Sequence, residues 1–336
     1  MMERSQFECL KTQVTAATAG QVLELEDLVQ RVVAQQFVEM ALARRTRQTL
    51  NTRSCPHCQS NNIVLHGKDR NRRQRFKCRG CCKSYNILTG TPMARARKPE
   101  KWGQYLSCMT EHMSVRKIVA SGIGVHQVTA WRWRHRFLQA AANDNAAILS
   151  GVVEANETFF PWSFKGSRAR KTGKSPQMRA AHPRARAGVK RGVLREPVPV
   201  LTALDNSGGV FEAILKSLSE IERALEGRIA AGSVLCSDGR AAYVAVADNA
   251  YAEHYAVSVA ALTSKIVNIN PVVMPARQPG RLGLGRVANH HVRLKYLINE
   301  RCRGVATKYL RNYLGWHRAM FRPGFEGTML LARALA

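Results

Sequence analysis

The sequence predicts a multi-domain α/β protein, and three observations support that class. Its 336 residues exceed the size of one small domain, so two or three domains are expected. Two close pairs of cysteines lie in residues 51–95, and a helical region follows them. From residue 150 onward, short apolar segments typical of strands alternate with helical segments. Hydrophobic residues make up 45% of the chain, which supports packed cores and excludes general disorder.

The charge balance predicts a polyanionic partner. Lys and Arg total 52 against 23 Asp and Glu, giving a formal charge of +29. Such a chain repels itself unless it meets a polyanion, and the phosphate backbone of nucleic acid is the commonest one. A ribosome-associated or simply basic protein is the alternative.

Cysteine usage and the absence of targeting signals predict a cytoplasmic protein. No secretory signal pattern opens the sequence, and no apolar run is long enough to span a membrane. Four of the nine cysteines form the two pairs, and a reducing compartment with free thiols fits them better than a disulfide framework. The other cysteines are scattered: Cys9, Cys82, Cys108, Cys236 and Cys302.

The N-terminal segment, residues 1–50, is predicted to be helical. Residues 22–45 read as one amphipathic helix, which we interpret as a packing helix. Its apolar residues fall at helical spacing: Leu25, Leu28, Val29, Val32, Val33, Phe37 and Met40.

Residues 51–95 read as a zinc ribbon. Cys55 and Cys58 form one C-x2-C pair, and Cys78 and Cys81 form the second, a spacing that closes a tetrahedral zinc site from two knuckle turns. So small a piece has almost no core, so metal binding would supply its folding free energy. Cys82 directly follows Cys81, but only Cys81 keeps the knuckle spacing. Two chance pairs are the alternative.

Strand candidates at 63–65 and 74–77 flank the turn-prone segment 67–71 of the ribbon. Arg70, Arg72 and Arg73 lie at this turn, and we expect them to contact DNA.

Residues 96–145 are predicted to form a helix–turn–helix region. Helices are expected at 102–113, 114–120 and 125–134, with a glycine-containing turn at 121–124 before the last one. An ordinary helical hairpin is the alternative. The expected DNA-binding residues of this region are Arg116, Lys117, Gln127, Thr129, Arg132 and Arg134.

The second large domain is predicted at residues 150–320, after a linker at 141–146. Strands are expected at 151–154, 198–204, 210–214 and 233–238, a helix at 217–229 with Ser217 and Glu220 in capping-box register, and helices from about 289 onward. A basic insertion at 165–195 is expected to pair with phosphate. It includes Lys165, Arg168, Lys190 and Arg191.

This order of elements is compatible with an RNase H-like mixed α/β nuclease core. In such a core, acids at the tips of the first and fourth strands and a third ligand from a late helix hold two divalent cations for phosphoryl transfer.

Five segments give the chain a resemblance to bacterial insertion-sequence transposases that join an N-terminal zinc ribbon to a DDE-type nuclease domain. They are Cys78–Pro92, Gly151–Phe160, Phe164–Arg168, Leu235–Tyr243 and Gly304–Arg318. The resemblance spans residues 50 to 320. It implies cutting and joining of double-stranded DNA at terminal inverted repeats and in target DNA, Mg²⁺ or Mn²⁺ as cofactor, and a homo-oligomer on DNA in the bacterial nucleoid.

The resemblance also identifies the expected catalytic positions. The first acid position of the family holds Asn156, the second holds Asp238, and the third, Glu or Asn in the family, holds Ala288, with Asn289 one residue along. Two of the three positions are therefore altered. Hard cations prefer carboxylate ligands, which these two positions lack. Glu154, on the same strand face as Asn156, is a candidate substitute.

Arg293 and Lys295 belong to the same late motif and are expected to contact DNA. Asp238 has an alternative role, capping the helix after its strand.

Three hypotheses remain open from the sequence. The first is a transposase with a damaged metal site, and the second is a non-catalytic DNA-binding regulator derived from one. The third, a zinc-ribbon RNA or ribosomal protein, leaves the second domain unexplained.

Overall fold

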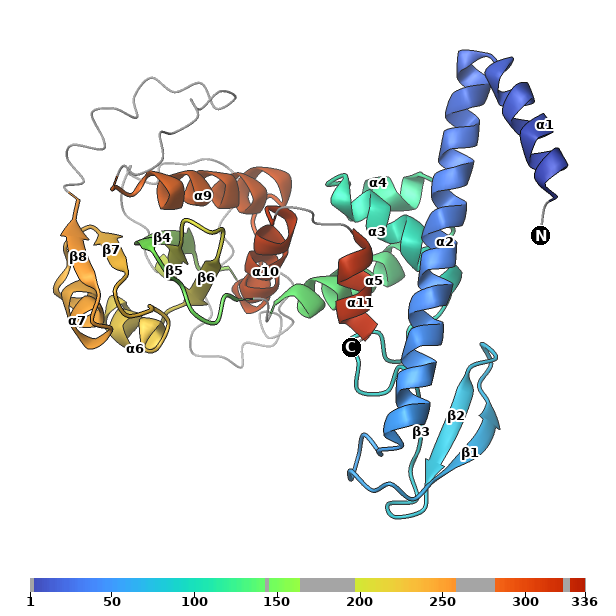
Figure 1. Ribbon diagram of the computed structural model, residues 1–336, viewed down its shortest axis with the longest axis horizontal. Coiled ribbons are helices and arrows are strands. Elements are labelled where there is room, and N and C mark those ends of the chain that lie inside the picture. Colours follow the sequence, from blue (N-terminus) through green and yellow to red (C-terminus); the bar gives the residue numbers. More distant parts are fainter. Residues whose placement is uncertain (1–2, 143–144, 164–196, 258–281, 323–326, 336) are drawn as a thin grey trace, which may run out of the picture. The chain divides into compact units, whose positions relative to one another are not determined.

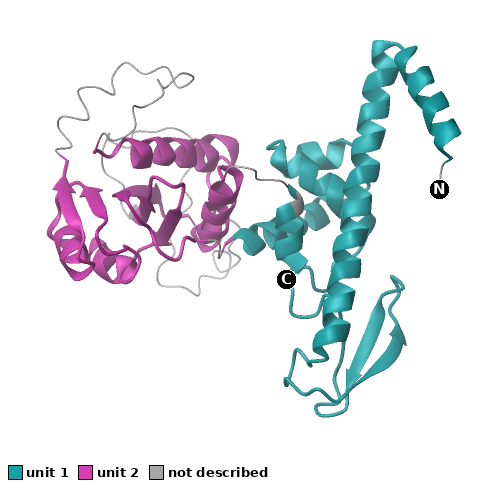
Figure 2. Cartoon of the chain, in the orientation of Figure 1, with its two compact units in different colours: residues 1–141, 324–336 teal, residues 142–323 magenta. Residues whose placement is uncertain are grey.

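The computed structural model describes residues 3–142, 145–163, 197–257, 282–322 and 327–335. The chain divides into two compact units, residues 1–141 with 324–336 (unit 1) and residues 142–323 (unit 2), coloured separately in Figure 2. Within the described residues, no helix is long and apolar enough to cross a membrane.

Unit 1 begins with two helices, α1 (Arg4–Thr15) and the 34-residue α2 (Ala19–Thr52). Thr18 caps α2 in a capping box with Gln21. The helix is longer than the predicted 22–45. Val38 is buried, whereas Leu28 and Val33 are about half exposed. The predicted packing role therefore applies to the second half of α2, where α3 (Trp102–Thr110) and α11 (Gly327–Leu335) contact it.

The ribbon region is an antiparallel sheet of β1 (Ile63–Lys68), β2 (Gln74–Cys78) and β3 (Ser84–Asn86), in that order. Phe76 of β2 stacks on Tyr85 of β3 with ring centroids 5.3 Å apart. Phe76 and Tyr85 are the buried aromatic side chains of the three strands, and Ile87 and Leu88, which follow β3, are also buried.

Three helices follow: α3 after the short η1 (Pro99–Lys101), then α4 (Val115–Ala120) and α5 (Gln127–Ala141). Ser114 caps α4 by accepting the Lys117 N–H. Gly122 and Gly124, at φ +79° and +69°, make the turn before α5. The buried Tyr105 hydroxyl donates to the Ala130 carbonyl at 2.5 Å and ties α3 to α5.

Unit 2 is built on a mixed sheet of β4 (Val152–Pro161), β5 (Pro197–Leu204), β6 (Val210–Ile214), β7 (Val234–Ser237) and β8 (Glu253–Ala256). The order is β6-β5-β4-β7-β8. Strands β4, β5 and β6 pair antiparallel, whereas β4 with β7 and β7 with β8 pair parallel (Figure 1). The predicted α/β class is confirmed.

Alternation along the strands gives the sheet two apolar faces. On one face, Val153 and Leu235 pack with α6 (Ile221–Leu225) and α7 (Ala241–Asn249). On the other, Phe160 and Val200 pack with α10 (Leu310–Met320), and Cys236 packs with the start of α9 (Gly285–Lys295). The short helices η4 (Tyr296–Arg301) and η5 (Thr307–Tyr309) lie between α9 and α10 in the sequence.

The helix predicted at 217–229 is wrong in extent. It consists of η3 (Leu218–Glu220) and the five-residue α6, and Gly227 at φ +64° follows its end. The Ser217–Glu220 capping box does not form, because the Glu220 carboxylate accepts from the Lys216 N–H instead.

Candidate functional site

The two cysteine pairs of unit 1 converge at the base of the hairpin. The Sγ atoms of Cys55, Cys58, Cys78 and Cys81 all lie within 4.8 Å of one another. Cys55 and Cys81 are 3.7 Å apart, and Cys58 and Cys78 are 3.6 Å apart, measured between Sγ atoms.

These separations fit zinc. A Zn–S bond of about 2.3 Å in tetrahedral geometry places sulfurs about 3.8 Å apart. Four cysteine sulfurs are also the donor set of a closed structural zinc site. The residues present therefore fit the ion that the spacing predicts.

The cysteines of the cluster shift one another's pKa values in opposite directions. A hydrogen bond from the backbone of Cys81 favours the thiolate of Cys78, whose pKa falls to about 6. At Cys58 the backbone of Ser60 also favours the thiolate, but burial and the neighbouring sulfurs raise the pKa to about 12. Four adjacent thiolates repel one another, so full ionisation needs a bound cation.

Cys82 stands apart from this cluster. It is exposed, has φ +58°, and its thiol lies 4.0 Å from the Arg79 carbonyl. The structure thus groups Cys81, not Cys82, with the other three cysteines.

The basic residues predicted on the ribbon differ in their surroundings. Arg70 and Arg72 are exposed at the hairpin tip. Arg73 is half-buried, with its guanidinium 5.9 Å from the centre of the Trp102 ring, and burial lowers its pKa. Arg70 and Arg72 are therefore available to a partner, while Arg73 packs within unit 1.

The basic residues predicted on α4 and α5 are also divided. Arg116, Lys117, Gln127 and Arg132 are exposed, and Thr129 is half-buried. Arg134 is instead engaged internally, because its guanidinium donates to the Met113 carbonyl.

Trp131 on α5 was missed by sequence reasoning. Its side chain is 42% exposed and lies against His135, with ring centroids 4.3 Å apart. Ala130 and Trp133 on the same helix are buried. Helical periodicity therefore could have predicted that Trp131 faces outward.

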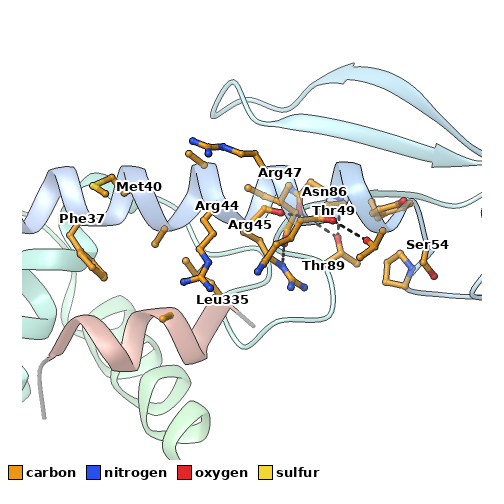
Figure 3. Close-up of a pocket in the computed structure, with 18 residues that line it drawn as sticks. Phe37, Met40, Arg44, Arg45, Arg47, Thr49, Ser54, Asn86, Thr89 and Leu335 are labelled. Carbon is orange, nitrogen blue, oxygen red and sulfur yellow. Dashed lines mark hydrogen bonds between the residues drawn. The ribbon is translucent and has the colours of Figure 1, made fainter. Parts of the chain in front are cut away.

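A hollow of about 860 Å³ lies beside the end of α2 (Figure 3). Arg44, Arg45 and Arg47 line it, together with Asn86 of the ribbon and Leu335 of α11. Sequence reasoning gave these arginines no site of their own.

The remaining predicted basic residues lie elsewhere. Lys165, Arg168, Lys190 and Arg191 are outside the described residues. Arg293 and Lys295 are exposed on α9, and the Arg293 guanidinium lies 5.1 Å from the centre of the Phe321 ring.

In unit 2 the pairing of β4 with β7 relates two of the expected catalytic positions. Their parallel register ends with Glu154 opposite Cys236. Continued by two residues on each strand, it brings Asn156 opposite Asp238 at the carboxyl end of β7. Asn156 therefore lies in the middle of β4 and Asp238 just after β7, on neighbouring strands of the sheet.

Asp238 is held by a cation from its own chain. The Arg240 Nε atom lies 2.8 Å from Asp238 Oδ2 and 3.8 Å from Glu157 Oε2. Glu157 is buried and accepts a 2.7 Å hydrogen bond from the Tyr243 hydroxyl. Asp238 also accepts from the Arg240 N–H, but α7 has no side-chain cap, so the capping role predicted for Asp238 is not formed.

Glu154 is occupied by the start of α9. Its carboxylate accepts the backbone N–H groups of Arg286 at 2.6 Å and Val287 at 3.0 Å, and the Arg286 Nε atom at 2.9 Å. These contacts satisfy free N–H groups of the first helical turn and place a negative charge at the positive end of the helix. The carboxylate predicted as a substitute ligand thus holds α9 against β4.

The third expected position lies on α9. Val287, His291 and Leu294 are buried and define the face of α9 that meets the sheet. At about 100° per residue, Ala288 lies at the edge of this face and Asn289 on the opposite side of the helix. Ala288 offers no ligand atom.

The described residues at these three positions do not fit a two-metal centre. Asp238 is the one carboxylate among them, and Arg240 already balances its charge. Hard divalent cations require several oxygen ligands with negative charge.

A buried polar cluster in unit 2 was also missed by sequence reasoning. Glu212 of β6 contacts His290 of α9, with Oε1 and Nε2 2.9 Å apart, and Arg318 of α10, with Oε2 and Nη1 2.5 Å apart. Burial opposes ionisation of Glu212, but these partners hold its pKa below the ordinary value. His317 of α10 lies edge-on to His290, and burial lowers its pKa to about 3.

Comparison with known proteins relates the chain to a mobile element. It is 27% identical over 212 residues to an uncharacterized protein in transposable element ISH50 of Halobacterium salinarum, which covers 60% of this chain and 68% of that protein. No protein-family profile matches the sequence. A cryo-EM structure of a simian T-cell lymphotropic virus intasome with a PP2A regulatory subunit aligns over 68% of this chain and 73% of its own. At 11% identity and a TM-score of 0.30, that alignment carries no structural conclusion.

The sequence match supports a coarse conclusion: this chain is related to a protein of a transposable element.

Proposed function

We propose that this chain is an insertion-sequence transposase by architecture, and that it binds the DNA ends of its element through unit 1. The observation that carries the proposal is the pairing of a zinc-type cysteine cluster with exposed basic residues on the hairpin and on α4 and α5. The likeness to a transposable-element protein supports it.

The hairpin and the helices supply two kinds of DNA contact. Arg70 and Arg72, exposed at the hairpin tip, suit phosphate oxygens. The exposed residues Gln127 and Arg132 lie on α5, the second helix of a helix–turn–helix, and suit base edges in a major groove. Phosphate contacts give affinity and base contacts give sequence preference.

The sheet of unit 2 supports the transposase architecture. An antiparallel β4–β5–β6 meander with β7 and β8 added in parallel is the arrangement of an RNase H-like core, with which the order of elements in the sequence is compatible. In that arrangement Asn156 lies in the middle of β4 and Asp238 follows the end of the neighbouring strand β7, the two positions where the family has its first two acids.

A second candidate function is a non-catalytic DNA-binding regulator derived from a transposase. It is favoured by the Arg240–Asp238 ion pair and by Asn156 and Ala288 at the other two positions. The Arg240 guanidinium neutralises the carboxylate of Asp238, whose negative charge a divalent cation would need.

Binding is tested with purified full-length protein and a labelled duplex carrying the terminal sequences that flank the gene. Binding is measured by fluorescence anisotropy across a range of salt concentrations. We expect Arg70→Ala to weaken binding to all duplexes and to lower the salt slope by about 1. Arg132→Ala should reduce the preference for the terminal sequence over a scrambled duplex.

Arg223→Ala is the matched control, because Arg223 is exposed on unit 2 and forms an ion pair with Glu220. It should leave both quantities unchanged. Absence of duplex binding by the unmodified protein would reject the proposal.

Cleavage of the same duplex in Mg²⁺ or Mn²⁺ separates the two candidates. Strand cleavage that Asp238→Ala abolishes identifies a working transposase. No cleavage by the unmodified chain, with cleavage gained by Asn156→Asp combined with Ala288→Asn, identifies a transposase-derived binder.

A further inference from the structure

Three buried side chains of unit 2 bring metal-type donor atoms together. Glu212 on β6, His290 on α9 and His317 on α10 each offer one donor atom, and these atoms lie within 4.8 Å of one another. The exposed fractions of the three residues are 4%, 9% and 0%. They come from three separate elements, so the fold assembles this cluster and no sequence motif marks it.

We propose that Glu212, His290 and His317 form a binding site for a divalent transition-metal ion such as Zn²⁺, separate from the cysteine cluster. Two imidazoles and one carboxylate are the protein ligands of one known class of zinc sites, which leave a fourth position open. Imidazole nitrogen selects zinc, copper, nickel or iron over magnesium and calcium. Ligands about 2.0–2.1 Å from a tetrahedral ion lie about 3.3 Å apart, within the observed span.

The state of His317 is the second, independent observation. Although the residue is fully buried, neither of its ring nitrogens has a hydrogen-bond partner among the described residues. Buried polar atoms in native proteins are nearly always paired, so an unpaired imidazole inside a polar cluster needs an explanation. A metal ion bound by its lone pair provides one.

The surroundings of Glu212 orient it for this role. Arg318 holds Oε2 and also donates to the Ala142 carbonyl at 3.3 Å, which leaves Oε1 on the side of His290. The Asn145 side chain holds the backbone of Glu212 on β6 with two hydrogen bonds. It accepts the Glu212 N–H and donates to the Glu212 carbonyl, each at 3.1 Å. Such outer contacts are the usual support of metal-binding carboxylates.

Charge sets the expected strength of binding. Arg318 already neutralises Glu212, so the ion's own charge is less well compensated here than among four cysteine thiolates. We therefore expect a chelator to remove metal from this site before it empties the cysteine cluster. His290 and Glu212, now 2.9 Å apart, must separate by a few tenths of an ångström on binding.

The test is the zinc content of full-length protein after zinc loading and dialysis, measured by elemental mass spectrometry. About two ions per chain are expected for the unmodified protein and about one for His317→Phe. Phenylalanine keeps the ring packed against Phe321 and removes no protein hydrogen bond. His291→Phe is the matched control, because His291 is a buried histidine of α9 with an unpaired nitrogen but lies outside the cluster.

A cobalt experiment decides the question independently of how the His317 variant folds. Chain carrying Cys55→Ser, Cys58→Ser, Cys78→Ser and Cys81→Ser is loaded with Co²⁺ and its visible spectrum recorded. Residual cobalt bands without thiolate charge-transfer absorption are the expected result. Absence of bound cobalt in this variant, or equal zinc content in His317→Phe and the unmodified protein, would overturn the proposal. The proposal does not depend on DNA binding, so it can fail or succeed separately from the proposed function.

Discussion

The cysteine cluster of unit 1 and the strand-end site of unit 2 differ in how completely their ligand sets are kept. In the cluster, all four expected donors are present and converge. On the neighbouring strands β4 and β7, Asp238 is the one carboxylate among the three expected catalytic positions, and Arg240 binds it. The strands of unit 2 therefore pair without a full set of ligand atoms at these positions, because backbone pairing does not depend on side-chain ligands.

The two regions also differ in what a lost ligand does to folding. Phe76 and Tyr85 are the buried aromatic side chains of the three hairpin strands, so we expect the ribbon to depend on a metal ion bound by its cysteines. The sheet of unit 2 has two apolar faces and stands without a metal at the strand ends. We therefore expect substitutions at the three expected positions of unit 2 to be better tolerated than substitutions of the four ribbon cysteines.

The largest effect is expected for Cys78→Ser. Cys78 is fully buried and contributes one of four sulfurs, so its loss should release the zinc and unfold the hairpin. We expect zinc per chain to fall by about one ion and trypsin to cleave within residues 62–77, with binding to duplex DNA weakened at least about tenfold, or about 1.4 kcal/mol.

Cys82→Ser is the control for this change, since Cys82 is exposed and outside the cluster. It should keep the zinc content and the protease resistance of the unmodified chain. Loss of zinc in Cys82→Ser, with retention in Cys81→Ser, would reverse the assignment of the fourth ligand.

A smaller effect is expected for Glu154→Gln in unit 2. The carboxylate is 1% exposed and joins Arg286 to the first turn of α9, so removing its charge leaves a guanidinium without its partner. Breaking a buried pair costs about 3–5 kcal/mol, and because Arg286 is one-third exposed we expect about 3 kcal/mol or less. Urea unfolding measures this cost.

Glu222→Gln supplies the comparison, since Glu222 is exposed and accepts one hydrogen bond, from Asn249. Its cost should stay within about 0.5 kcal/mol. If Glu154→Gln left stability unchanged and instead abolished Mg²⁺-dependent cleavage, Glu154 would be a catalytic ligand and the contrast between the two sites would fail.

Much of the fold followed from local patterns in the sequence. The hairpin strands β5 and β6 were predicted almost to the residue, because their apolar runs flank the turn at Asp205–Gly208. The short strand β8 was not, because Glu253–Ala256 lacks an apolar run and is formed by pairing with β7. The exposed apolar side chains of α2 were also unexpected. Helical periodicity shows that they share one face of the helix, but not whether another element packs against that face.

The candidate sites also differ in whether local sequence patterns predict them. Cysteine spacing predicts the ligands of the ribbon from 27 consecutive positions, 55 to 81, because the turns that hold them are local. The partners of Asp238 and Glu154 could not be predicted from the sequence. Arg240 meets Asp238 through the conformation of its long side chain, and Arg286 meets Glu154 because α9 packs against β4. The Glu212 cluster joins residues up to 106 positions apart, beyond any sequence motif.

The smallest effect tests whether the cysteine cluster is independent of the helices in its own unit. Gly103 of α3 packs so closely on α2 that a Cβ atom would overlap the backbone carbonyl of Ala34. Gly103→Ala should therefore force the two helices apart at a cost of about 1–3 kcal/mol. Gly20→Ala, where a Cβ meets nothing within 4 Å, should instead be neutral or slightly stabilising. Because the ribbon is closed by its own sulfurs, zinc content should be equal in both variants while the urea midpoint falls only in Gly103→Ala. Loss of zinc in Gly103→Ala would show that the ribbon depends on the α2–α3 contact, and that its stability is not local to the cysteine pairs.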